Sequence, residues 1–188
     1  MNIIWLGHSC FVVESAGWRV VLDPYYVETY PALHIEADEA LCSHGHRDHA
    51  FLEAVTLSGR DKSESPFTVE TVSAFHDDKQ GLLRGENIIH ILRTEGLTLV
   101  HCGDLGHELS EKQLAAVKGC DALLIPVGGY YTTRRRQKRS RTRSRRACSC
   151  RCTTASARTA TLRSAHSMNF WRCMRQRRST NLMGTLSS

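Results

Sequence analysis

Apolar residues recur along the first 130 residues in short runs that glycine, proline or polar residues interrupt. The runs are rich in valine, isoleucine and leucine, and they cover residues 2–7, 10–15, 18–24, 39–43, 67–75, 87–95, 97–104 and 122–129. Short aliphatic runs between turn signals are typical of β-strands. We therefore expect this part of the chain to consist mainly of strands.

Two pairs of runs are separated by glycine at the spacing of a β-hairpin, in "VVESAGWRVV" (12–21) and "ILRTEGLTLV" (91–100). Two other segments have helical patterns, "HRDHAFLEAV" (46–55) and "LSEKQLAAVKG" (109–119), the second with Ser110 as N-cap and a glycine after its last turn. Strands with interspersed helices predict an α/β or α+β fold, with an antiparallel meander at its start. No internal repeat is visible.

Composition is that of one soluble domain: the chain has 188 residues, of which 41% are hydrophobic, and no apolar run is long enough to span a membrane. The first residues, "MNIIWLGHSCFVVES", lack the basic segment and long apolar core of a signal peptide. We interpret them as a first strand and expect a cytoplasmic protein. Nothing in the sequence indicates the oligomeric state.

Charge and cysteine usage divide the chain near Thr132. Nine of the 25 lysines and arginines precede Thr133 and sixteen follow it, so residues 1–133 carry a formal charge of −10 and residues 134–188 one of +16. Single cysteines lie among apolar residues in the first part, whereas four crowd the second: Cys148, Cys150, Cys152 and Cys173. The sequence thus predicts a domain over residues 1–132 and an Arg/Ser/Cys-rich tail over residues 133–188.

The clearest chemical signal is "CSHGHRDHA" (42–50), which places His44, His46, Asp48 and His49 within six residues, directly after an apolar run. His44 and His46 project to the same side of an extended backbone and can share one metal ion. Asp48 and His49 point elsewhere, so two ions are implied. Three imidazoles and a carboxylate this close would repel one another or lose protons without a cation.

A structural role is the more common one for isolated histidines, so His34, His90, His101 and His166 receive no function. For the clustered histidines, imidazole and carboxylate ligands favour Zn²⁺, with Mn, Fe or Ni as alternatives. A metal site with one open position lowers the pKa of bound water to about 7 and makes a metal-bound hydroxide available as a nucleophile. These residues therefore predict a hydrolase.

The motif "SHGHRDH", together with "WLGHSCFVVE", "VLDPY", "SAFHDD", "LVHCGDLGH" and "LLIPVGGYYT", resembles the metallo-β-lactamase-fold hydrolases, in particular the ascorbate-6-phosphate-lactonase-like branch. The resemblance covers residues 1 to about 132. It implies a four-layer αββα sandwich with two metal ions at one edge of the paired sheets. It also implies a small-molecule substrate with an ester, lactone or phosphoester bond.

The resemblance implies ligands as well: His44, His46 and His76 for the first ion, Asp48 and His49 for the second, and Asp104 between the two. Asp48 would orient or deprotonate the water. Three further residues could contact the substrate or the ligands, or could serve as ordinary turn residues: His8, Asp23 and His107.

The tail departs from the family's pattern, which continues with Ile-Asp-Ala, a helix and a strand ending in Pro-Met-His-Tyr. A one-base change of reading frame lets "MNFWRCMR" (168–175) decode as Asp-Glu-Phe-Leu-Ala-Leu-Tyr-Ala, and "CRCTTA" (150–155) as Val-Pro-Met-His-Tyr-Arg. The first is an amphipathic helix. We therefore interpret the tail as out of frame after Thr132. A genuine basic arm that binds nucleic acid, in a nuclease or a binding protein, is the alternative.

A frameshift would impair the chain as written. We expect its C-terminal part to be incomplete, because residues 1–132 would supply only the first half of the two-sheet sandwich. The tail would stay disordered, since it is poor in large apolar residues, and would bind nucleic acid only non-specifically. The second metal site would lose the family's last histidine, so metal binding would be weak and mostly limited to His44, His46 and His76.

Overall fold

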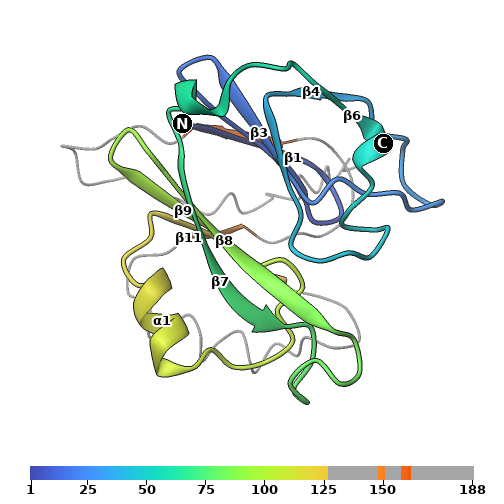
Figure 1. Cartoon of the computed structure of the whole chain (residues 1–188), viewed down its shortest axis with the longest axis vertical. Helices are drawn as coiled ribbons and strands as arrows, with labels where there is room; N and C mark the ends of the chain where they lie inside the picture. The colour runs from blue at the N-terminus through green and yellow to red at the C-terminus, as the bar shows by residue number, and fades with distance from the viewer. Residues whose placement is uncertain (127–147, 151–157, 162–188) are drawn as a thin grey trace, which may run out of the picture.

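The computed structural model describes residues 1–126, 148–150 and 158–161 (Figure 1). A first five-stranded sheet has the order β12-β1-β2-β3-β5. Its strands are β1 (Asn2–Gly7), β2 (Cys10–Ser15), β3 (Trp18–Leu22), β5 (Glu39–Leu41) and β12 (Arg158–Thr161). The neighbours β12, β1, β2 and β3 pair antiparallel, and β5 joins parallel to β3. The expected meander at the start of the chain is confirmed.

A second five-stranded sheet has the order β11-β10-β9-β8-β7. It contains β7 (Thr68–Phe75), β8 (Glu86–Thr94), β9 (Leu97–His101), β10 (Ala122–Leu124) and β11 (Cys148–Cys150). The strands β7, β8 and β9 pair antiparallel, whereas β10 lies parallel to both β9 and β11. A separate parallel pair joins β4 (Ile35–Ala37) to β6 (Val55–Leu57).

Both predicted hairpins form. Ala16 and Gly17 connect β2 to β3 with φ of 47° and 74°, and Glu95 and Gly96 connect β8 to β9 with φ of 52° and 71°. Two consecutive left-handed residues give the turn a twist that matches the twist of paired strands. Glycine at the second position adopts this conformation without a steric cost.

The two sheets pack face to face, and their central strands are buried on both sides, whereas the edge strand β7 is exposed or half-buried along most of its length. Along β3, Val20 belongs to the cluster between the sheets and Val21 to a cluster on the outer face; along β10, Leu124 and Leu123 divide in the same way. Successive side chains of a strand point to opposite faces, so a strand covered on both faces needs apolar residues throughout. This explains the continuous apolar runs of the sequence.

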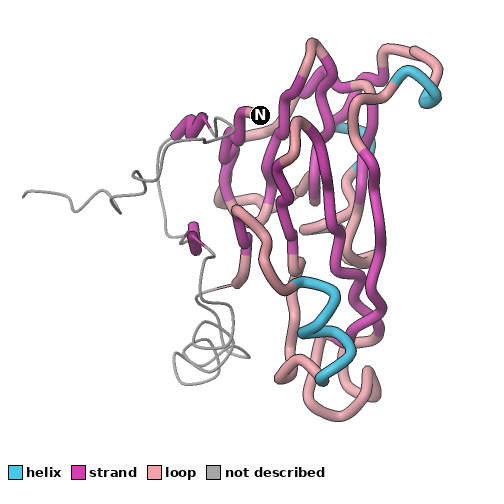
Figure 2. The backbone as a smooth tube through the Cα atoms, turned by 90° about the vertical axis from the view of Figure 1, so that its left-hand side faces the viewer, coloured by secondary structure: helices cyan, strands magenta, loops and turns pink. Residues whose placement is uncertain are grey.

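The outer faces are covered differently. Helix α1 (Glu111–Val117) packs on the outer side of the second sheet, where Val117 joins Val100 and Leu123 in one cluster (Figure 1). Its N-terminus has a capping box of Ser110 and Gln113, as the sequence predicts a helix here. The first sheet is covered by the β4–β6 pair and by loops, and the described chain has many more residues in strands than in helices (Figure 2).

The expected helix over residues 46–55 is wrong. Residues 47–49 form a turn, a short 3₁₀ helix η1 spans Leu52–Ala54, and Val55 begins β6. Val55 is placed by its pairing with Ile35 in β4, and the Phe51 amide donates to the Pro24 carbonyl at 2.9 Å. These tertiary hydrogen bonds replace the helical ones that the local pattern favoured. A second 3₁₀ helix, η2, spans Lys62–Glu64.

The expectation that residues 1–132 supply only half of the sandwich is also wrong. Four strands of each sheet come from residues 2–124, and fully buried Trp18 and Leu99 pack in the cluster between them. Two short strands from the tail, β11 and β12, add to the edges of the two sheets, and the expectation of a disordered tail stays a prediction. The remaining tail residues, His166 among them, lie outside the described residues. No helix in the described ranges is long and apolar enough to cross a membrane.

Candidate metal centre

Three of the predicted ligands come together from two segments. His44 and His46 lie on the loop after β5, and His76 directly follows the end of β7. The ring centroid of His44 lies 4.7 Å from that of His46 and 4.8 Å from that of His76. One ring nitrogen of each residue lies within 4.8 Å of the other two. We call His44, His46 and His76 the three-histidine group.

A second group adjoins the first and consists of His8, Asp48 and His49, which also offer ligand atoms within 4.8 Å of one another. His8 Nε2 and His49 Nε2 lie 3.8 and 3.9 Å from the same oxygen, Oδ2 of Asp48. We call this set the mixed group. Because His8 belongs to the turn between β1 and β2, the group joins parts of the chain that lie about forty residues apart.

Asp104 connects the two groups. Its Oδ2 atom lies 3.2 Å from Nε2 of His76 and 3.5 Å from Nε2 of His49. Asp104 lies in the loop after β9, and its backbone amide donates to Oδ1 of buried Asn87 at 3.0 Å. A carboxylate in this position can contact ions bound to either group.

Asp23 is the buried centre of a hydrogen-bond network behind the ligands. Its carboxylate accepts from the amide and hydroxyl of Ser43 at 2.6 and 2.8 Å, from His49 Nδ1 at 2.8 Å and from His101 Nε2 at 2.8 Å. Asp23 is itself left-handed, with φ of 48°. Such strain persists where surrounding contacts determine the conformation. Asp23 therefore fixes the start of the ligand loop and one edge of His49.

The hydrogen bonds also fix the tautomer of His44. Because the Ser43 hydroxyl donates its only proton to Asp23, its oxygen is an acceptor for Nδ1–H of His44 at 3.0 Å. The Nε2 lone pair of His44 is then free, and this buried atom has no hydrogen-bond partner in the described part of the chain. A buried polar atom without a partner is costly unless it binds something. A neutral imidazole with a free Nε2 is a suitable metal ligand.

The three-histidine group and the mixed group differ in the pKa values of their histidines. Burial and the neighbouring His49 and His76 rings lower the pKa of His44 to about 4. Burial alone would also lower the pKa of His49, but the carboxylates of Asp104 and Asp23 raise it to about 10. For Asp104, burial raises the pKa of the carboxyl, but His49 and His76 outweigh this and hold it well below its usual range. The Asp104 carboxylate also raises the pKa of His76, so its negative charge acts on both groups.

Of the three residues with undecided roles, two belong to the centre. Asp23 supports the ligands, and His8 is part of the mixed group. His107 has other hydrogen-bond partners than these ligands. Its Nε2 accepts from the Phe75 amide at 3.0 Å, and its Nδ1 donates to the Glu108 carbonyl at 2.8 Å. His107 therefore holds the end of β7 and the loop around residue 108, and it joins none of the described ligand groups.

Sequence reasoning missed four residues of this network: Ser9, Ser43, Asn87 and His101. His101 was given no role, yet it is buried and bonded to Asp23. A signal for it exists in the strand pattern, because His101 follows Leu97 and Leu99 at a spacing of two and so faces the apolar interior. A polar side chain there needs a partner. The serines and Asn87 carried no such signal.

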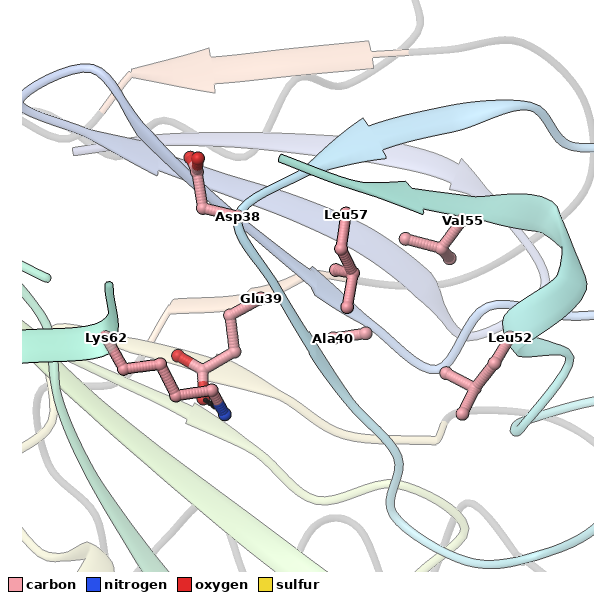
Figure 3. A pocket seen from close by; sticks show the side chains of 7 residues that line it. All are labelled: Asp38, Glu39, Ala40, Leu52, Val55, Leu57 and Lys62. Atoms are coloured by element: carbon pink, nitrogen blue, oxygen red, sulfur yellow. Dashed lines mark hydrogen bonds and ion pairs between the residues drawn. The ribbon is translucent and has the colours of Figure 1, made fainter. Parts of the chain in front are cut away.

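A cavity of about 170 Å³ lies beside β5 and β6, apart from these ligands (Figure 3). Leu52, Val55 and Leu57 form its apolar wall, and Glu39 meets Lys62 across it at 3.0 Å. None of the predicted site residues lines this cavity, so the candidate centre is the ligand cluster.

Comparisons with known proteins identify the family. Residues 2–140 match the family model of the beta-lactamase superfamily domain. The chain belongs to this superfamily. A UPF0173 metal-dependent hydrolase of Carboxydothermus hydrogenoformans is 30% identical over 168 aligned residues, covering 70% of this chain and 74% of the relative. A similar protein of Archaeoglobus fulgidus is 28% identical and covers 70% and 73%.

Solved structures agree. A protein of Thermotoga maritima assigned to the Zn-dependent hydrolases of the metallo-β-lactamase superfamily is 28% identical with a TM-score of 0.61, covering 82% of this chain and 76% of that one. The predicted metallo-β-lactamase fold is therefore confirmed. The finer assignment to the ascorbate-6-phosphate-lactonase-like branch stays a prediction.

Proposed function

We propose that this member of the superfamily is a hydrolase that uses two divalent metal ions to cleave an ester, lactone or phosphoester bond. His44, His46 and His76 would hold the first ion, Asp48 and His49 the second, and Asp104 would contact both. Imidazole and carboxylate donors suit zinc, and also manganese, iron or nickel. Bound ions would act as Lewis acids and lower the pKa of coordinated water to about 7.

The observation that carries the proposal is the position of Asp104 between His76 and His49. Its single oxygen Oδ2 lies 3.2 and 3.5 Å from the two ring nitrogens. In each of these rings the contacted atom is Nε2, and in His49 the other nitrogen is bonded to Asp23. Two adjoining ligand groups with a shared carboxylate match the requirement of chemistry in which two cations act on one substrate.

The chain's own residues have distinct tasks in such a reaction. Asp48 has a side chain that is 42% exposed, so it can reach both the mixed group and incoming solvent. We assign to it the orientation of the attacking water and the uptake of its proton. Asp23 keeps Nδ1 of His49 occupied and so directs Nε2 toward Asp104. In the same way, the Ser43 hydroxyl keeps Nδ1 of His44 occupied and leaves Nε2 of that ring available as a ligand atom.

The substrate is proposed to be a small molecule that reaches the ligand groups from solvent, since His46 is exposed and Asp48 and Asp104 are partly exposed. The nucleic-acid alternative rests on residues 134–188, most of which lie outside the described residues. Human tRNase Z, short form, is 10% identical with a TM-score of 0.59, and this likeness concerns the fold alone. No observation on the described residues favours that alternative.

The test is a double variant, His46→Ala with Asp48→Ala, which removes one ligand from each group. We expect its affinity for Zn²⁺ or Mn²⁺ to fall by more than the roughly 100-fold that follows loss of an outer-shell partner, and its content of bound metal to approach zero. His34→Ala with Glu36→Ala is a matched control, because it removes an exposed imidazole and an exposed carboxylate elsewhere. Stoichiometric metal in the first variant would contradict the proposal.

A further inference from the structure

His8 reaches the metal centre from the turn between β1 and β2. Its Nε2 lies 3.8 Å from Oδ2 of Asp48, and its ring centroid lies 5.0 Å from that of His49. Its side chain is 27% exposed, so the ring lies partly inside the protein beside two other ligand candidates. None of the family comparisons assigns a role to this residue.

One hydroxyl orients both rings of the mixed group. Ser9 Oγ lies 3.0 Å from Nδ1 of His8 and 2.9 Å from Nδ1 of His49. The hydroxyl oxygen can accept from Nδ1–H of His8, whereas the Nδ1–H of His49 donates to Asp23 at 2.8 Å and has Ser9 Oγ as a second, neighbouring acceptor. Both Nε2 atoms are then unprotonated when the rings are neutral, and both face the Asp48 carboxylate. This arrangement is typical of imidazole ligands, whose second nitrogen is held by an outer hydrogen bond.

The backbone holds His8 in place at a cost. His8 has φ of 46°, in the left-handed region that few residues other than glycine adopt, with asparagine, aspartate and histidine the most frequent of these. The rings of Tyr25 and Tyr30 each pack against the His8 ring, with centroids 5.9 Å away. Strain of about 1 kcal/mol or more at a functional position indicates that the side chain's location matters.

We propose that His8 is a third protein ligand of the second divalent ion, together with Asp48 and His49. This inference rests on the proposed function. With His8 as a ligand, the second metal site has three protein ligands even without the family's last histidine, so binding of two ions is expected. Two atoms bound to one tetrahedral ion at about 2.0–2.1 Å lie roughly 3.4 Å apart. The separations of 3.8 and 3.9 Å around Asp48 therefore need to close by only a few tenths of an ångström.

The chain as written is the protein to test, with Zn²⁺ titrated against a chromophoric chelator and bound metal measured by elemental analysis. We expect about two equivalents in the unchanged chain. His8→Asn should retain about one, because asparagine tolerates a left-handed backbone but lacks the imidazole. His8→Gly is the second variant, since glycine relieves the strain and keeps the fold accessible. His34→Asn, at an exposed position, is the control and should retain two.

Ser9→Ala separates orientation from ligation. It leaves His8 in place and should weaken only the second equivalent, by about 10- to 100-fold. Two equivalents bound with unchanged affinity in both His8 variants would overturn the role of His8 while leaving the two-metal hydrolase intact. A single bound equivalent of metal in the unchanged chain would also overturn the role of His8 as a ligand. Absence of metal from every chain, the control included, would instead overturn the proposed function.

Discussion

The three-histidine group and the mixed group adjoin each other, yet they are built in different ways. The first has three imidazoles and depends on the close packing of two loops. The second combines a carboxylate with two imidazoles, and buried hydrogen bonds from Asp23 and Ser9 hold His49 in place. One loop, residues 43–49, supplies ligands to both. The comparison shows that a single sequence motif can supply two groups that share one buried carboxylate, because Asp23 holds His49 directly and His44 through Ser43.

Asp23→Asn is expected to have the largest effect, and mainly on the mixed group. Removing this charge leaves buried His49 with Asp104 as its remaining carboxylate partner and takes the hydrogen-bonded carboxylate from His101, and loss of one partner of a buried pair costs about 3–5 kcal/mol of folding free energy. We also expect weaker binding of the second metal equivalent. Chemical denaturation and metal titration measure both effects. Unchanged stability would mean that Asp23 does not organise the centre.

Gly106→Ala should act on the three-histidine group. A Cβ atom at Gly106 would lie 2.2 Å from the backbone carbon and oxygen of His76, so His76 must move. We expect a loss of about 1–3 kcal/mol in stability and weaker binding of the first ion, with the mixed group less affected. Gly45→Ala is the control, because nothing lies within 4 Å of a Cβ there. Equal effects of the two substitutions would argue against close packing as the support of His76.

Asp38→Asn is expected to have the smallest effect and to leave both groups unchanged. Burial raises the pKa of the Asp38 carboxyl, but bonds from the Ser58 hydroxyl and the Arg19 amide outweigh this and hold it below its usual value. Its stabilisation is therefore present above the unfolded pKa of about 4 and is lost as the pH falls through the folded value.

The variant should be less stable than the unchanged chain by about 1 kcal/mol at pH 7, and the difference should shrink toward zero in acid. Denaturation curves at several pH values measure this. A difference that is constant with pH would show that the charge of Asp38 contributes nothing, and altered metal binding would show that the groups are not independent of this loop.

The sequence by itself determined both hairpins, α1, the candidate ligand loop and eight of the strands, whereas β4, β6, β11 and β12 were not predicted. Each of these depends on local rules: short apolar runs between turn residues, glycine in a left-handed turn, a serine cap, and histidines clustered at the spacing of metal ligands. The prediction that the tail is out of frame also comes from the sequence alone, and it stays a prediction.

Only the tertiary structure decided the supports of the centre. Residues 46–55 have a helical pattern but do not form a helix, because β6 pairs with β4 and hydrogen bonds to distant segments outweigh local propensity. Likewise, Ser9 is an ordinary residue in sequence, and the strand pattern indicates only that His101 faces the interior. Their roles arise where the β1–β2 turn and β9 bring them to His49 and Asp23. Hydrogen bonds over such separations depend on the packing of whole sheets, and no local pattern records that packing.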